Sequence, residues 1–110
     1  MRRYKGLWDD EVKKLYASAK SSFKKADNPC GLSQAYIFEG SFYSVLGNTE
    51  KSVELISEAV KIAEYCDLRA VRASALKTLG YNLNVMGEYA EAMNRYTEAY
   101  DIYAELEELE

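Results

Sequence analysis

The sequence predicts an all-α protein made of about five helices, arranged as antiparallel helix-hairpin repeats in the manner of an α-solenoid. Composition supports this, because a chain that is 48% hydrophobic and 29% charged with a single proline is typical of a helical protein. Apolar residues recur at helical spacing along the chain. When the sequence is aligned with itself at a shift of 40 residues, similar residues coincide. A period of this length is typical of stacked supersecondary units. The best-matched pairs are Gly40 with Gly80, Gly47 with Gly87, Ala35 with Ala75 and Ala59 with Ala99.

Residues 8–27 form the first expected element, a helix that has no partner before it. Its apolar residues share one face, and they are Trp8, Val12, Leu15, Tyr16, Ala19 and Phe23. A second shift by the same period places Ala19 on Ala59, which is in the second helix of the next hairpin. We therefore expect residues 8–27 to be the second half of a hairpin whose first half is missing.

Residues 28–66 form the first expected repeat, with helices over about 29–46 and 49–65. Either Asn28 or Asp27 can cap the first of these helices, because both side chains accept hydrogen bonds from free backbone N–H groups. Pro29 then falls in the first turn, where its missing N–H costs least. Gly47 in "LGNTE" is expected to end the helix.

Residues 67–106 form the second expected repeat. Asp67 is the expected N-cap of a helix that runs to about Met86, and Gly87 ends it. A second helix runs from Glu88 to about Leu106. Residues 107–110 are acidic and oppose the helix dipole, so we expect this end to fray. The whole chain, 1–110, is expected to be a single domain.

Small residues inside the helices predict where neighbouring helices approach. A glycine inside a helix costs about 0.5–1 kcal/mol relative to alanine. Filling a packed contact costs about 1–3 kcal/mol, so close packing outweighs helix propensity. We expect Gly40 and Gly80 to admit the side chains of Ile56 and Tyr96 from the paired helices. The full set of expected packing residues is Gly40, Gly47, Ala59, Gly80, Gly87, Ala92, Tyr96 and Ala99.

This pattern resembles the tetratricopeptide repeat, or TPR, in the longer variety with a period near 40 residues. The second repeat carries Leu76, Leu79, Gly80, Leu83, Gly87, Tyr89, Ala92, Tyr96 and Ala99, and the first carries Tyr36, Gly40, Tyr43, Gly47, Ile56 and Ala59. The chain departs from the family pattern at Glu39, where Leu is usual, and at Ser52, where Ala is usual. The usual terminal proline is replaced by Glu64 and Ala104.

The resemblance implies a scaffold or adaptor that binds a partner peptide or helix in a concave groove lined by the first helix of each pair. Carried onto this chain, the groove-facing residues are Gln34, Ile37, Phe38, Ser41, Ser44, Ser74, Lys77, Thr78, Tyr81 and Asn84. Phe38 and Tyr81 are the expected anchors, because large rings on a groove wall are typical of partner-binding hot spots. Lys77 and Asn84 are expected to contact the partner's backbone or a carboxylate. Any one of these residues can equally be an ordinary solvent-facing position.

Several classes of function find no support in the residues. The chain contains no histidine, no Gly-rich phosphate loop and no nucleophile elbow, so we expect no enzyme, no cofactor and no metal site. No apolar run approaches the roughly 20 residues of a membrane span. The start lacks the apolar core of a signal peptide, which predicts a cytoplasmic protein in which Cys30 and Cys66 are free thiols.

Charge is distributed unevenly along a chain of net charge −4. Residues 1–26 hold eight basic and three acidic residues, whereas "AELEELE" closes the chain without a base. The basic stretch lacks interleaved exposed aromatics, so we do not expect nucleic-acid binding. One alternative to groove binding is that the chain is a fragment of a larger regulatory protein. The other is self-assembly as a homo-oligomer through apolar residues of the terminal helices. These residues are Trp8, Leu15, Phe23, Tyr100, Tyr103 and Leu106.

Overall fold

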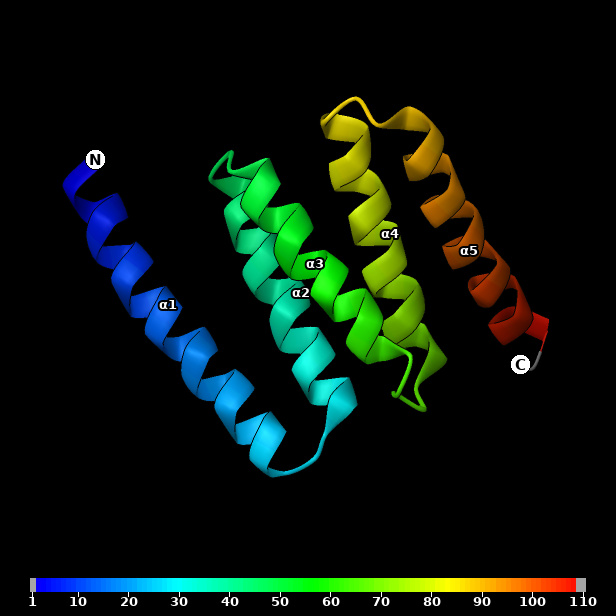
Figure 1. The fold of residues 1–110 in the computed structure, drawn as a ribbon, viewed down its shortest axis with the longest axis horizontal. Helices are drawn as coiled ribbons and strands as arrows, with labels where there is room; N and C mark the ends of the chain where they lie inside the picture. Colours follow the sequence, from blue (N-terminus) through cyan, green and yellow to red (C-terminus); the bar gives the residue numbers. More distant parts are fainter. Residues whose placement is uncertain (1, 109–110) are drawn as a thin grey trace.

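The computed structural model describes residues 2–108, and the side chains of residues 10–107. Five α-helices follow one another along the chain, and no strand occurs within residues 2–108. They are α1 (Arg2–Lys25), α2 (Pro29–Val45), α3 (Thr49–Ala63), α4 (Arg69–Val85) and α5 (Tyr89–Glu108) (Figure 1). The prediction of an all-α protein with about five helices is therefore confirmed.

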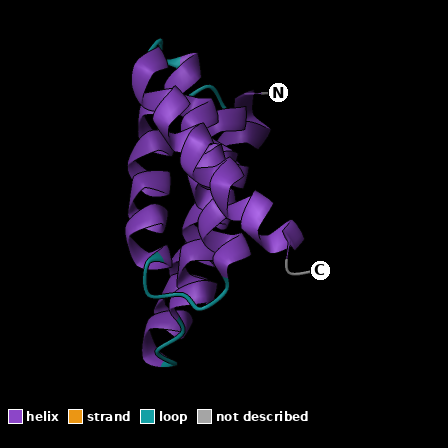
Figure 2. Ribbon diagram, turned by 90° about the vertical axis from the view of Figure 1, so that its right-hand side faces the viewer, coloured by secondary structure: helices purple, strands orange, loops and turns teal. Residues whose placement is uncertain are grey.

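The helices pack as consecutive antiparallel pairs. Each helix contacts the next one in the chain, and α2 also contacts α4 directly. The shortest dimension of the molecule is 21 Å, which corresponds to two layers of helices (Figure 2). Because the backbones of α2 and α4 approach each other while those of α3 and α5 do not, α2 and α4 run beside each other along one face of the described part of the chain.

Three of the four connections end the preceding helix in the same way. In each, an N–H group bonds to the carbonyl five residues earlier, which is the Schellman arrangement. These bonds join Asn28 to Phe23, Asn48 to Tyr43 and Glu88 to Leu83. The residue just before the donor has a positive φ: 51° at Asp27, 85° at Gly47 and 86° at Gly87. Gly47 and Gly87 therefore end their helices as predicted, and Asp27 does the same without the freedom of a glycine.

The connection between α3 and α4 differs, and here the predicted N-cap is wrong. Leu68 rather than Asp67 precedes the first helical residue, and no side chain caps α4. The turn has only short bonds, such as the one from the Cys66 N–H to the Ala63 carbonyl, and no residue with a positive φ. Helix α4 therefore begins one residue later than expected, with its first N–H groups uncapped.

The ends of other helices also refine the expectations. Asn28 is the residue that caps α2, because its Oδ1 accepts a hydrogen bond from the Gly31 N–H at 2.9 Å. The start expected at residue 8 is wrong, since α1 begins at Arg2; the arginine, lysine and leucine before residue 8 favour a helix. Helix α5 continues to Glu108, two residues past the expected end, while residues 109–110 of the predicted frayed segment lie outside the described residues.

Gly40 and Gly80 lie where the paired helices approach each other closely. A Cβ atom at Gly40 would meet the Ile56 side chain, with its Cδ1 at 2.9 Å, and the Ser52 carbonyl at 3.2 Å. A Cβ atom at Gly80 would lie 3.2 Å from Tyr96 Cδ1 and 3.3 Å from the Ala92 carbonyl. Both glycines are buried, and the side chains that fill their notches are those that the sequence indicates.

Glu39, which departs from the family pattern, is buried and paired. The Lys20 ammonium group on α1 lies 2.6 Å from Glu39 Oε1 on α2, and the same ammonium lies 4.6 Å from the centre of the Tyr36 ring. A buried carboxylate requires such a partner, so the departure from leucine is matched by a lysine on the neighbouring helix.

The two cysteines form a disulfide, which contradicts the prediction of free thiols. Cys30 at the start of α2 is bonded to Cys66 in the α3–α4 connection, with Cα atoms 4.8 Å apart. The sequence prediction counted residue spacing and compartment only, whereas the fold brings together two positions 36 residues apart. Disulfides persist mainly in oxidising surroundings. The cysteines therefore do not support the predicted cytoplasmic location.

Candidate binding groove between α2 and α4

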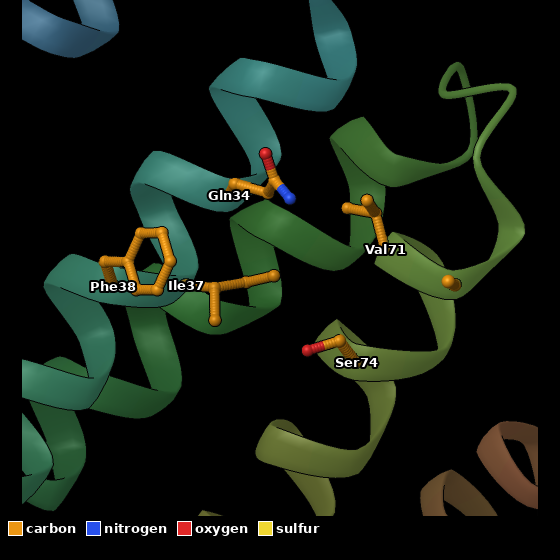
Figure 3. A pocket seen from close by; sticks show the side chains of 6 residues that line it. Gln34, Ile37, Phe38, Val71 and Ser74 are labelled. Carbon is orange, nitrogen blue, oxygen red and sulfur yellow. The ribbon is translucent and has the colours of Figure 1, made fainter.

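A first hollow lies between the N-terminal halves of α2 and α4, and we call it the N-terminal hollow. It has a volume of about 190 Å³. Its lining comprises Gln34, Ile37 and Phe38 from α2 with Ala70, Val71 and Ser74 from α4. Figure 3 shows Gln34 and Ile37 directed from α2 toward α4, Val71 and Ser74 directed from α4 toward α2, and the Phe38 ring lying over α2 beside them. Ile37 and Val71 form its apolar floor, because both are buried in the cluster that includes Ala59 and Ala75.

A second hollow, the C-terminal hollow, continues the groove toward the ends of the same helices. It has a volume of about 290 Å³ and is lined by Ser41, Ser44 and Val45 from α2 with Thr78, Tyr81 and Asn82 from α4. Asn82 is 1% exposed, and its amide group donates to the Thr78 carbonyl at 3.0 Å. Within the described residues, Asn82 Oδ1 accepts no hydrogen bond.

None of the twelve residues that line these two hollows is charged. Large apolar side chains are nevertheless exposed along the groove: Phe38 is 61% exposed, Val45 87% and Tyr81 56%. Hydroxyl and amide groups from serine, threonine, glutamine and asparagine stand among them. The groove can therefore bury apolar groups and form hydrogen bonds to a neutral backbone, but it supplies no charge for phosphate or carboxylate binding.

A third hollow, of about 360 Å³, lies on the other side of Tyr81, between α4 and α5. It is lined by Lys77, Thr78, Tyr81, Tyr96 and Tyr100, and we call it the tyrosine hollow. Tyr96 and Tyr100 stack with ring centres 6.4 Å apart, and the Lys77 ammonium group lies 5.9 Å from the centre of the Tyr103 ring. Burial raises the pKa of the Tyr96 phenol, and the neighbouring Tyr100 and Tyr81 hydroxyls raise that pKa further.

The structure brings most, but not all, of the predicted groove residues together. Those that line the α2–α4 groove are Gln34, Ile37, Phe38, Ser41, Ser44, Ser74, Thr78 and Tyr81. Lys77 is directed toward α5 instead, and the exposed Asn84 lines neither hollow. Ile37 is a core residue at the groove floor rather than a free contact.

The prediction from the sequence missed four lining residues, which are Val45, Ala70, Val71 and Asn82. Val45 had a usable signal, because it stands two helical turns after Phe38 and therefore on the same face. Asn82 had a weaker one, since it stands one turn after Thr78. Ala70 and Val71 had no signal in the sequence, because their position depends on how the α3–α4 connection orients α4.

The residues predicted for self-association do not form one open surface. Leu15 is 68% exposed and Tyr100 is 61% exposed. Phe23 instead packs against Gly31, while Tyr103 and Leu106 pack against the cluster of Ala73, Leu76, Ala99 and Ile102. Trp8 belongs to the stretch whose side chains lie outside the described residues.

Among the side chains that the structure describes, no group of three or more His, Cys, Asp or Glu residues is placed to hold a metal ion. No described helix combines the length and hydropathy that a membrane crossing requires. Comparison of the chain with protein families, with curated proteins and with solved structures finds no match.

Proposed function

We propose that the chain is a non-catalytic interaction module that holds a segment of a partner protein in the groove between α2 and α4. One observation carries this proposal. The groove has twelve lining residues without a charge, and three large apolar side chains stand exposed along it. Exposed rings beside a hollow are typical anchors of protein–protein contacts.

We further propose that the α2–α3 and α4–α5 pairs are two repeats of one TPR-like unit. Equivalent contacts at the 40-residue shift support this. Gly40 accepts Ile56 as Gly80 accepts Tyr96, and the turns at Gly47 and Gly87 have the same left-handed geometry. In such an array the first helices of the pairs form one wall, which is the wall that carries the groove.

The groove also restricts the chemistry of the partner segment. Since the lining is neutral, the inserted residues are uncharged, because an unpaired charge loses its hydration there without compensation. The two hollows are centred about seven residues apart along α2, which corresponds to roughly 10 Å. The partner segment therefore presents two apolar side chains about that far apart, with backbone groups between them.

Selection from a displayed random peptide library tests the proposal. Phe38→Ala combined with Tyr81→Ala should weaken binding of the selected peptides at least tenfold, as expected for anchors in a small interface. Tyr65→Ala is the matched control, because Tyr65 is 78% exposed but lies in the α3–α4 connection outside the groove. Peptides that bind the Phe38/Tyr81 variant and the wild type equally would refute groove binding.

Self-assembly is the second candidate, and exposed apolar residues on α5 favour it. Tyr89, Met93 and Tyr100 are all exposed and recur at helical spacing on one face of α5. Sedimentation at increasing protein concentration distinguishes the two candidates. A dimer that Tyr100→Ala dissociates, together with an empty peptide selection, would favour self-assembly.

A further inference from the structure

The disulfide closes the one connection that lacks its own closing hydrogen bond. The other three connections carry a five-residue backbone bond and a residue with a positive φ, whereas the α3–α4 connection has neither. Cys66 is the only buried residue between the end of α3 and the start of α4. Its bond to Cys30 is therefore what fixes this connection to the start of α2.

Helix α4 benefits from this anchor because its first turn has neither a capping side chain nor a buried ion pair. Leu68, the residue before the helix, is 60% exposed and offers no capping side chain. Arg69 pairs with Glu105 on α5, but both side chains are largely exposed, and an exposed ion pair contributes little. Without the disulfide, the first turn of α4 would keep its backbone bonds and the packing of the buried Val71 side chain.

That same first turn forms one wall of the N-terminal hollow. Ala70 and Val71 line the hollow, and Val71 shares an apolar cluster with Cys66 and Ile37, against which Cys30 also packs. The disulfide thus lies next to the apolar floor of the N-terminal hollow. The C-terminal hollow lies toward the other ends of α2 and α4, and the connections that follow these ends are closed by the Gly47 and Gly87 turns.

We propose that Cys30–Cys66 is a reversible thiol–disulfide exchange site that controls the N-terminal end of the groove. The oxidised chain has an ordered wall and a complete groove. In the reduced chain, the α3–α4 connection and the first turn of α4 loosen, so that only the C-terminal hollow stays formed. The loosening of the α3–α4 connection on reduction does not depend on any partner. The effect on partner affinity rests on the proposed function.

The exchange requires a small thiol such as glutathione as its co-reactant. A thiolate attacks the half-buried Cys30 sulfur, because Cys66 is only 7% exposed. The S–S bond breaks, Cys66 leaves as a thiolate and takes up a proton, and a mixed disulfide remains on Cys30. A second thiol displaces Cys30, which gives two protein thiols and one glutathione disulfide. The Leu68 carbonyl lies 3.6 Å from the Cys66 sulfur and can accept a hydrogen bond from the new thiol.

Hydrogen exchange of the full chain in oxidised and reduced glutathione tests the proposal. Reduction should speed exchange of the hydrogen-bonded amides within residues 66–72, such as those of Cys66 and Val71, by about tenfold or more, because this segment opens locally. Amides around the Gly87 turn serve as the internal control and should change little. Equal exchange of residues 66–72 in both buffers, or alkylation showing free thiols in oxidised glutathione, would overturn the proposal.

A rescue variant distinguishes local loosening of the first turn of α4 from a general loss of stability. Leu68→Asp places an N-cap carboxylate before α4, so the reduced variant should exchange at 66–72 several-fold more slowly than the reduced wild type. Asp67→Asn changes the preceding exposed residue and should give no such rescue. If the selected peptides bind both redox forms equally while exchange differs, the exchange site stands but its control of the groove fails. If no peptide binds either form, the proposed function fails and the exchange result keeps its meaning.

Discussion

Substitution of Gly40 by alanine tests the close approach of α2 and α3. Alanine favours a helix over glycine by about 0.5–1 kcal/mol, so propensity alone predicts a more stable protein. The new Cβ atom, however, would lie 2.9 Å from Ile56 Cδ1 and 3.2 Å from the Ser52 carbonyl. Ile56 is fully buried and cannot move aside into solvent. Overpacking of this kind costs about 1–3 kcal/mol, so we expect Gly40→Ala to lower the free energy of unfolding by about 1–2 kcal/mol.

Gly80 supplies the comparison within the same molecule. There the nearest atoms to a new Cβ lie at 3.2–3.3 Å, and the Tyr96 ring is only partly buried, so it can yield by a few tenths of an ångström. Gly80→Ala should therefore change the free energy of unfolding by less than about 0.5 kcal/mol.

Urea denaturation followed by far-ultraviolet circular dichroism measures both variants. Ile56→Ala removes the side-chain atoms that the new Cβ at Gly40 meets, so the double variant Gly40→Ala/Ile56→Ala should be less destabilised than the sum of the single changes. If Gly40→Ala is more stable than the wild type, the helices do not approach at this notch and the packing argument is wrong.

Three further predictions use the same denaturation assay. Replacing Cys30 and Cys66 together by serine should cost about 4 kcal/mol, since the disulfide closes a loop of 36 residues; a loss below 1 kcal/mol would show that the bond hardly constrains the chain. Lys20→Met should cost about 2–4 kcal/mol because it leaves Glu39 buried without its cation, and adding Glu39→Leu should recover most of that loss. Asn82→Leu should raise stability by about 1 kcal/mol, because the unpaired amide oxygen is removed; a large loss would mean that this oxygen is satisfied in solution.

Much of the fold could be predicted from the sequence because the determinants are local. Gly47 and Gly87 end helices through their own backbone conformations, and Asn28 caps α2 through its own side chain. The predicted contact between Gly40 and Ile56 is also present in the structure. It could be predicted because the repeat pattern indicates both the small residue and the large side chain that packs against it.

The features that the sequence did not predict are those that depend on distant residues. The disulfide joins two positions that only the packing of α2 against α3 and α4 brings together. The late start of α4 and the lining by Ala70 and Val71 follow from that connection. The resemblance to the TPR pattern predicts Lys77 in the groove, whereas the Lys77 ammonium group lies near the Tyr103 ring of the neighbouring α5.

The central claim, that a partner segment occupies the α2–α4 groove, is tested most directly by mapping a selected peptide on the protein by NMR. Backbone and side-chain amide shifts should change at Gln34, Ser41 and Thr78, which line the groove from both helices. Signals of Met93, which is exposed on α5, should stay unchanged. Shifts concentrated on Met93 and its neighbours, with Gln34 and Ser41 unaffected, would place the partner on α5 and contradict the account.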